Sequence, residues 1–287
     1  MSDPKATSVR QRLLNRAQQD GEDFNLVLAR YVGLRFLHRL AQSRYSEEFL
    51  LKGATLFLVW GGNPHRPTRD IDLLGFMPPD LDGMAQVMRE VCAQEVEPDG
   101  LLFDPATVAT ETIREENAYG GIRCTVVARL GSARQKLQID IGHGDAISPE
   151  PESVEIPRLL DDEERREMRA YRVETVIAEK FEAMVSLGLA NSRMKDFYDI
   201  DFLFRRLSIS EMDLAMAIAR TFARRKVKLS EGPPNALTSE FWSSELAQSR
   251  WLAFASKNKL TVDPLEAVCR RIWLALDGPT RAAQKMK

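Results

Sequence analysis

Two aspartates separated by a single residue, Asp70 and Asp72, lie inside an apolar run and constrain this chain more than any other feature. Successive side chains of a β-strand point to opposite faces, so in a strand both carboxylates share one face while Ile71 and Leu73 point to the other. Two like charges this close repel each other, and burying either of them is costly without a cation. A divalent metal ion removes both costs, and hard oxygen ligands suit Mg²⁺. The alternative is a solvated edge strand with two surface acids, which the apolar neighbours disfavour.

The residues before this strand predict a glycine turn between a buried strand and a short helix. Residues 49–51 (FLL) are typical of the end of a buried strand, and residues 52–55 (KGAT) of a tight passage into a helix over residues 55–60. Gly53 allows the backbone to come close to a ligand, and the N–H groups at the start of a helix attract phosphate. Residues 61–64 (GGNP) then predict a turn that leads into the aspartate strand.

The composition indicates an ordinary globular protein of the cytoplasm. The formal net charge of −2 over 287 residues gives no global attraction to nucleic acid, so any RNA contact needs a local basic patch. Three cysteines without CxxC spacing are typical of reduced, structural thiols. The sequence contains no apolar run of membrane-spanning length, and we expect a soluble protein with no membrane partner.

A third aspartate, Asp140, lies between apolar residues in a later part of the chain. Residues 107–113, 122–130 and 136–141 alternate like strands, and a short turn at Gly131 suggests that the last two form an antiparallel pair. Asp140 lies between Ile139 and Ile141. A lone aspartate in a strand is usually found at an edge, so the residues alone leave its role open.

The second half of the chain reads as helical. Residues 148–158 contain three prolines and predict a connector, so we expect domains over residues 1–150 and 151–287. Lys180 falls on the apolar face of a helix expected over residues 173–189; it either snorkels to water or meets a buried acidic or phosphate partner. Asp196 begins the next helix, where an acid also complements the helix dipole.

Basic residues gather in two places, and a solvated helix face is the simpler interpretation of both. Contact with phosphate is the alternative. The first set lies along or just beyond a helix expected over residues 25–43, and the second lies at the end of a later helix: Arg30, Arg35, Arg39 and Arg44; Arg220, Arg224, Arg225, Lys226 and Lys228.

The order of strand, glycine turn, helix, turn and a strand ending in Asp-hydrophobic-Asp resembles the signature of the polymerase-beta-like nucleotidyltransferases. K-G-A-T-x-L followed by R-P-T-R-D-I-D-L is similar to the AbiEii/AbiGii-type toxin family, which includes the MenT toxins. A-E-K at 178–180 and R-x-K-D-F-Y-D at 193–199 are similar to a second block of that family. The resemblance covers residues 8–206. It implies an α+β, bilobal fold with a nucleotidyltransferase core built on a mixed sheet, a mainly helical C-terminal lobe, and substrate between the two.

The resemblance also implies roles for individual residues. Asp70 and Asp72 would bind Mg²⁺. Asp140 would be a third metal-binding carboxylate on a neighbouring strand, where it would help a second metal ion, or act itself, to activate the attacking hydroxyl. Lys180 would neutralise charge on the triphosphate, and Asp196 would orient Lys180 or contact the sugar or base of the nucleotide. These five residues form the expected catalytic set. The expected nucleotide-binding residues are Lys52, Gly53, Ala54, Thr55, Arg66, Thr68 and Arg69.

The activity implied in this way is that of a toxin of a toxin–antitoxin system. It would transfer NMP from an NTP to the 3′ end of tRNA, block translation, and be relieved by a cognate antitoxin. Two alternatives stay open: a nucleotidyltransferase that modifies a small molecule or a protein hydroxyl, and a non-catalytic interaction protein on the same fold. The sequence leaves open which NTP is used, which tRNA is chosen and how the antitoxin acts.

Overall fold

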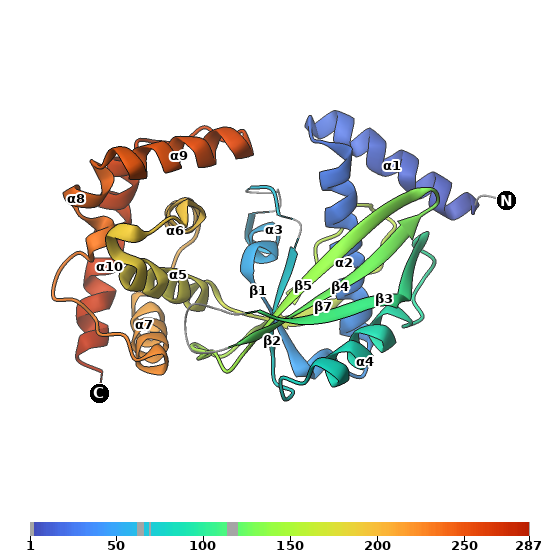
Figure 1. The fold of residues 1–287 in the computed structure, drawn as a ribbon, viewed down its shortest axis with the longest axis horizontal. Coiled ribbons are helices and arrows are strands. Elements are labelled where there is room, and N and C mark those ends of the chain that lie inside the picture. Colours follow the sequence, from blue (N-terminus) through green and yellow to red (C-terminus); the bar gives the residue numbers. More distant parts are fainter. Residues whose placement is uncertain (1–2, 62–65, 69, 114–119, 287) are drawn as a thin grey trace. The chain divides into compact units, whose positions relative to one another are not determined.

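A computed structural model describes residues 3–61, 66–68, 70–113 and 120–286. The chain forms two compact units (Figure 1). Unit 1 comprises Met1–Gly144 and Glu152–Ala170, and unit 2 comprises Asp145–Pro151 and Tyr171–Lys287. Sheet and helices together give the α+β class that was expected. Whether independently folding domains meet at residue 150 stays a prediction. Within the described ranges, no helix has the length and apolar character needed to span a membrane.

The described part of unit 1 is built on one mixed sheet of seven strands in the order β3-β4-β5-β2-β1-β7-β6. The β2–β5 and β1–β7 pairs are parallel, and the other neighbours are antiparallel. The mixed sheet confirms the prediction. The strands are β1 (Phe49–Lys52), β2 (Asp70–Gly75), β3 (Leu101–Ile113), β4 (Gly121–Leu130), β5 (Ala133–His143), β6 (Glu152–Glu155) and β7 (Glu167–Ala170).

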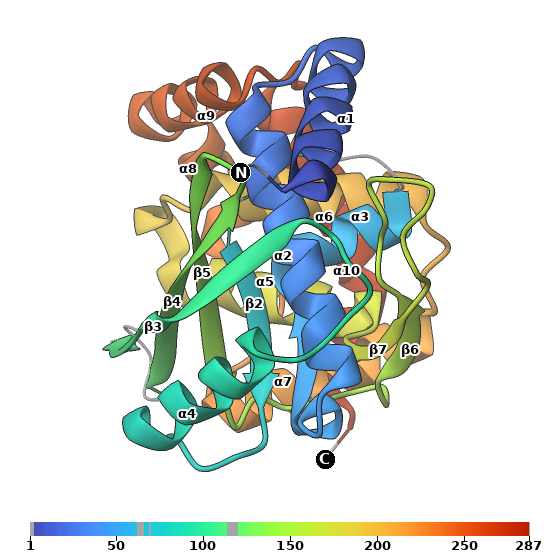
Figure 2. The same cartoon turned by 90° about the vertical axis from the view of Figure 1, so that its right-hand side faces the viewer.

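One face of this sheet is covered by helices. Figure 2 shows α2 (Phe24–Gln42) lying across it, with α1 (Pro4–Asp20) beside α2 and α4 (Leu81–Cys92) against β3. Gly33 of α2 lies so close to the sheet that a Cβ there would be 3.1 Å from Cδ1 of Ile71. Ile71, Ile139 and Ile141 on this face are buried. Because strand side chains alternate, their neighbours emerge on the opposite face, where the acids of β2 and β5 lie.

Unit 2 is helical: α5 (Val173–Leu187), α6 (Met194–Arg206), α7 (Glu211–Arg225), α8 (Ser239–Trp242), α9 (Glu245–Asn258) and α10 (Leu265–Gln284). Aromatic pairs join these helices. The rings of Phe181 and Phe222 lie 5.4 Å apart between α5 and α7, and those of Phe197 and Phe241 stack at 5.3 Å between α6 and α8. The helix predicted over residues 173–189 is confirmed as α5.

Two strands depart from the expectation that the chain is helical beyond its proline-rich connector. β6 lies inside the expected connector, and β7 adds to the sheet of unit 1 with Ala170 paired in parallel with Leu51. The physical reason is length. Each strand has four residues and buries one or two side chains, Val154 in β6 and Met168 and Ala170 in β7, which is too few to produce a recognisable alternation.

Three arginines that were interpreted as solvated instead form ion pairs with acids of the fold. Arg35 and Arg39 of α2 are buried and both bind Asp99. Arg225 of α7 donates to Glu182 at 2.5 Å and to Asp145 at 3.3 Å. The solvated-face interpretation is therefore wrong for these residues, because each has an acidic partner far away in the sequence.

Candidate active site

The paired acids lie on β2 as the alternation predicts. Ile71 and Leu73 are buried, whereas Asp70 is exposed and Asp72 is partly exposed on the opposite face. In the antiparallel neighbour β1, Lys52 is paired directly with Asp72. The two carboxylates therefore share an accessible face of the sheet, at the edge of the turn that follows β1.

That turn packs against one of the carboxylates. Gly53 has a φ of +71°, in the left-handed region that favours glycine, and a Cβ there would lie 2.0 Å from Oδ2 of Asp72. Any side chain at this position would displace the carboxylate. Gly53, Ala54 and Thr55 form a single 3₁₀ turn (η2), which leads into α3 (Leu56–Gly61). The glycine turn of the sequence analysis is thus confirmed, and its tight approach is to Asp72.

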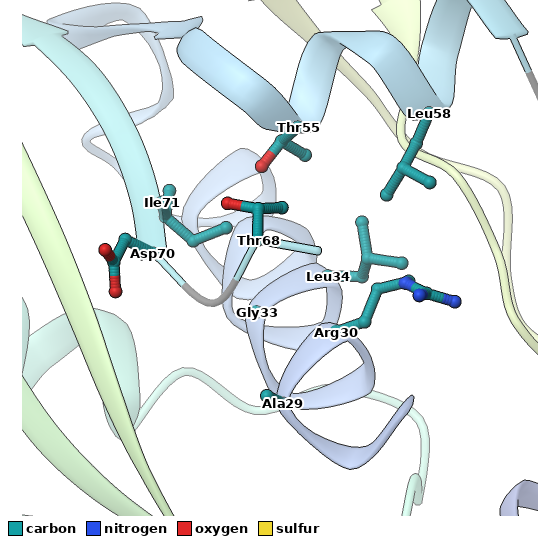
Figure 3. A pocket seen from close by; sticks show the side chains of 9 residues that line it. All are labelled: Ala29, Arg30, Gly33, Leu34, Thr55, Leu58, Thr68, Asp70 and Ile71. Carbon is teal, nitrogen blue, oxygen red and sulfur yellow. The ribbon is translucent and has the colours of Figure 1, made fainter. Parts of the chain in front are cut away.

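Thr55 and Thr68 lie beside the acids at a small cavity. Figure 3 shows both hydroxyl groups on the side of the cavity nearer to Ile71, while the carboxylate of Asp70 points away from the threonines. The cavity volume is about 10 Å³, no more than a single water needs. Thr55 is buried. Nucleotide binding by these threonines stays a prediction, as it does for Arg66. Arg69 lies outside the described residues.

Asp140 lies on the strand next to the paired acids. β5 runs parallel to β2, and Asp140 is the register partner of Asp72, which confirms its predicted place in the sheet. Its carboxylate is held by an arginine: Nε of Arg123 donates to Oδ1 at 2.9 Å and Nη2 donates to Oδ2 at 2.9 Å. Nε2 of Gln138 also donates to Oδ2, at 3.2 Å. The hydrogen bonds from Arg123 to Asp140 raise the pKa of Arg123, and the charges of Asp140, Glu111 and Asp70 add to this effect.

Arg123 was not among the residues predicted from the sequence. The signal was present, because Arg123 stands between Ile122 and Cys124 in the same alternation that drew attention to Asp140. An alternation shows which face a residue occupies; it does not show which residue stands opposite on the next strand.

The acids of β2 suit an open magnesium site with few protein ligands better than a site in which the protein supplies every ligand. Within the described residues, no group of three His, Cys, Asp or Glu side chains is arranged to hold a metal ion. Mg²⁺ is usually bound by one or two carboxylates together with waters and substrate phosphates, which is what Asp70 and Asp72 on one open face can supply. A metal-binding role for Asp140 stays a prediction.

A second cluster of predicted residues lies in unit 2, between α5 and α6. Nζ of Lys180 donates to Oδ1 of Asp196 at 2.7 Å and to Oδ2 of Asp199 at 2.8 Å, and Nε of Arg193 donates to Oδ2 of Asp196 at 2.6 Å. The side chains of Asp196 and Asp199 are fully buried, whereas Lys180 keeps 12% of its side chain exposed. Lys180 therefore has a buried acidic partner, one of the two possibilities left open by the sequence.

Electrostatics fix the charge state of this cluster. Burial lowers the pKa of Lys180, but the charges of Asp196 and Asp199 outweigh it and hold the pKa above the usual value. Burial raises the pKa of Asp196, and Lys180 and Arg193 more than reverse this. Both oxygens of Asp196 are engaged, a geometry that favours orienting Lys180 over contacting the nucleotide. Asp199, in the quoted R-x-K-D-F-Y-D block, was not identified as a second partner.

Comparison with known families decides the class of the protein. The model of the family described as "Nucleotidyl transferase AbiEii toxin, Type IV TA system" matches residues 35–276. The chain belongs to the AbiEii nucleotidyltransferase toxin family. It is therefore a nucleotidyltransferase and a toxin of a toxin–antitoxin system, and the family implies an NTP substrate and an antitoxin partner.

Solved structures of the same fold support the architecture of this AbiEii-family chain. MenT4, a nucleotidyltransferase toxin from Mycobacterium tuberculosis H37Rv, is similar with a TM-score of 0.56 and 17% identity over 97% of this chain and 92% of that one. JHP933 from Helicobacter pylori is similar with a TM-score of 0.50 and 16% identity over 89% of this chain and 93% of that one. At such identities the likeness establishes the fold alone. No curated protein matches the sequence.

Proposed function

We propose that this AbiEii-family toxin is a Mg²⁺-dependent nucleotidyltransferase that transfers NMP from an NTP to the 3′ end of tRNA in the cytoplasm, blocks translation, and is relieved by a cognate antitoxin. The observation that carries the proposal is the pair of carboxylates on β2. Asp70 and Asp72 share one open face of the sheet, and the glycine turn after β1 packs against Asp72.

The residues of unit 1 bind and align the nucleotide. Asp70 and Asp72 would hold Mg²⁺, which would supply positive charge to neutralise the triphosphate and the pyrophosphate leaving group. Gly53 lets the backbone approach closely, and Ala54 offers no side chain that blocks it. The remaining nucleotide contacts are proposed for Lys52, Thr55, Arg66, Thr68 and Arg69. In the transfer itself, the oxygen of the 3′ hydroxyl bonds to the α-phosphorus, the bond from that phosphorus to the bridging oxygen breaks, and the hydroxyl proton passes to solvent.

Lys180 contributes a permanent positive charge. Its raised pKa keeps the ammonium protonated, so it acts as a cation toward a polyanionic substrate and not as a base. Two of its three N–H donors are used by Asp196 and Asp199, an arrangement that fixes the ammonium and restricts its rotation. We assign Asp196 the role of orienting Lys180.

The choice of tRNA as acceptor rests on the likeness of the two motif blocks to the toxin family. The net charge of −2 neither requires nor excludes an RNA acceptor. The antitoxin follows from membership of a toxin–antitoxin family.

The direct test supplies purified protein and Mg²⁺ with each α-labelled NTP and separate pools of tRNA, total protein and small hydroxyl compounds. We expect a labelled tRNA band whose label is removed by trimming the 3′ end. Label in protein or in a small molecule would instead identify another class of nucleotidyltransferase. If Asp70→Ala leaves toxicity and labelling unchanged, the proposal of a catalytic role for the β2 acids fails in favour of a non-catalytic protein.

A further inference from the structure

Five charged residues form one row across the sheet of unit 1. Register pairs Lys52 with Asp72, Asp72 with Asp140, Asp140 with Arg123, and Arg123 with Glu111. Residues directly opposite each other on neighbouring strands project from the same face, so these side chains stand side by side on the open face. Asp140 therefore lies between a proposed metal ligand and an arginine.

Arg123 donates hydrogen bonds to both carboxylate oxygens of Asp140. Two parallel N–H···O bonds of 2.9 Å each form the fork geometry that makes arginine–carboxylate pairs strong and well oriented. The Gln138 amide donates to one of the same oxygens and fixes the carboxylate further. A metal ion on Asp140 would compete with the guanidinium for these oxygens and would be placed beside a positive charge.

Arg123 keeps donors that Asp140 does not use. The hydrogen bonds to Asp140 use Nε and Nη2 of Arg123. Nη1 lies 3.9 Å from Oε1 of Glu111, which is beyond hydrogen-bond distance. The Glu111 side chain is 68% exposed. One third of the Arg123 side chain is exposed. The fork leaves three N–H groups unused, two on Nη1 and one on Nη2, and a planar guanidinium with spare donors suits a phosphate oxygen.

We propose that Asp140 acts through Arg123 and not as a metal ligand: it holds the guanidinium so that Arg123 binds a phosphate of the nucleotide beside a single ion on Asp70 and Asp72. This inference rests on the proposed function and narrows its site. Arg123 is then a substrate-binding residue, and Asp140 is a positioning residue. A merely structural role, joining β4 to β5, is the competing explanation.

The test counts metal ions and measures nucleotide affinity in the same samples. Mn²⁺ binding is followed by electron paramagnetic resonance in the presence of each α,β-methylene NTP in turn, which cannot undergo transfer. The variants are Arg123→Gln, Arg123→Lys, Asp140→Asn and the double variant Arg123→Gln/Asp140→Asn. Arg129→Gln is the matched control, because Arg129 is an exposed arginine on the same strand.

We expect one Mn²⁺ per wild-type chain, and the same number with little change in metal affinity in Asp140→Asn and Arg123→Gln. Both variants should weaken binding of the nucleotide analogue about tenfold, since a charge-assisted hydrogen bond to phosphate is lost or misaligned. The double variant should bind it no more weakly than Arg123→Gln, because both changes remove one interaction. Arg123→Lys, which keeps the charge and is the milder change for folding, should fall between wild type and Arg123→Gln.

Two outcomes overturn the inference. Two Mn²⁺ per wild-type chain, with one lost in Asp140→Asn, would make Asp140 a metal ligand. Unchanged nucleotide affinity in both Arg123 variants would leave the pair a structural link. Failure of the proposed function gives a different result: Asp72→Asn would then bind Mn²⁺ as tightly as wild type, whatever the Arg123 variants do.

Discussion

Gly53 shows how closely the backbone of this family member is fitted to its acids. A side chain at Gly53 would have two separate effects. It would strain the turn, because φ is positive, and it would displace the carboxylate of Asp72, because its Cβ would lie 2.0 Å from Oδ2. Gly131, in the turn between β4 and β5, has a similar φ of +58° but open space around it. The two glycines therefore allow backbone strain to be separated from displacement of Asp72.

We predict that Gly53→Ala lowers nucleotidyl transfer about a hundredfold, because a shift of roughly 1 Å in a group that positions substrate has effects of this size. Gly53→Ala and Gly131→Ala should each destabilise the fold by about 1 kcal/mol, since both force alanine into the left-handed region. Gly131→Ala should leave transfer intact. Transfer rates and urea unfolding curves of both variants check this; equal activity in the two variants would show that Asp72 does not need the glycine.

The Lys180 cluster is held together by charge, and its removal should have a pH signature. In the wild type, the raised pKa of Lys180 and the lowered pKa of Asp196 keep their contribution to stability constant between about pH 4 and pH 10. Lys180→Met removes the cation that the buried carboxylates of Asp196 and Asp199 share, although Arg193 still donates to Asp196. Breaking a buried ion pair typically costs about 3–5 kcal/mol.

That loss should be larger at pH 8 than at pH 5. The two acids can relieve their repulsion by taking up a proton, which favours the folded state and becomes harder as the pH rises. Urea unfolding at both pH values measures the difference. Lys257→Met, at an exposed position of α9, serves as the control and should change stability by less than about 0.5 kcal/mol. Equal losses at both pH values for Lys180→Met would contradict the assigned charge states.

For single residues, the sequence predicted which face of a strand or helix a side chain occupies better than it predicted which residue that side chain contacts. Asp70 and Asp72 were placed by alternation alone, and Lys180 by its position on an apolar stripe. Their relation to Arg123 or Asp199 depends on strand register and helix packing, which local patterns do not contain. For the same reason Arg39 and Arg225 were interpreted as surface charges, although their partners lie far away in the sequence.

Among the elements, α2 is anchored by a buried polar network. Arg35 and Arg39 both donate to the Asp99 carboxylate, and the hydroxyl of Tyr31 donates to the backbone carbonyl of Asp99 at 2.8 Å. These bonds join the helix to the segment that leads into β3. His38 is buried in the same region. Its Nδ1 lies 3.5 Å from Nη2 of Arg35, and its Nε2 lies 3.7 Å from Oε2 of Glu164.

His38 should make the stability of this region depend on pH. Burial, assisted by the charge of Arg35, lowers the pKa of His38 to about 4, so between about pH 4 and 6.5 the unfolded chain binds more protons than the folded one. Stability from this residue is therefore present above pH 6.5 and lost as the pH falls, by up to about 3 kcal/mol. Urea unfolding of wild type and His38→Gln from pH 7 to pH 4 should show that the variant loses less stability. Parallel pH profiles would show that His38 titrates normally.

Elements with a long pattern were predicted from the sequence, and short ones were not. β2 and β5 carry an alternation of apolar and charged residues, and α5 carries a complete apolar stripe. β6 and β7 bury only Val154, Met168 and Ala170 among charged residues. β7 joins the sheet by pairing with β1, and β6 joins it by pairing with β7; no local pattern of four residues encodes either contact.

For the whole molecule, membership of a toxin–antitoxin family makes toxicity a property that single substitutions can test. We predict that Asp72→Asn, expressed at the wild-type level in the same host, no longer arrests growth, because it weakens metal binding and leaves the sheet intact. Growth curves with immunoblots for protein level check this. Arrest by the variant at the wild-type rate would separate toxicity from the β2 acids.

Incorporation of α-labelled nucleotide into tRNA, measured for wild type and Asp72→Asn at equal concentration with Mg²⁺, tests the central claim most directly. We predict label at the 3′ end of tRNA with the wild type and a rate lower by about a hundredfold or more in the variant, since metal-assisted charge stabilisation amounts to several kcal/mol. Equal incorporation by both proteins would contradict it.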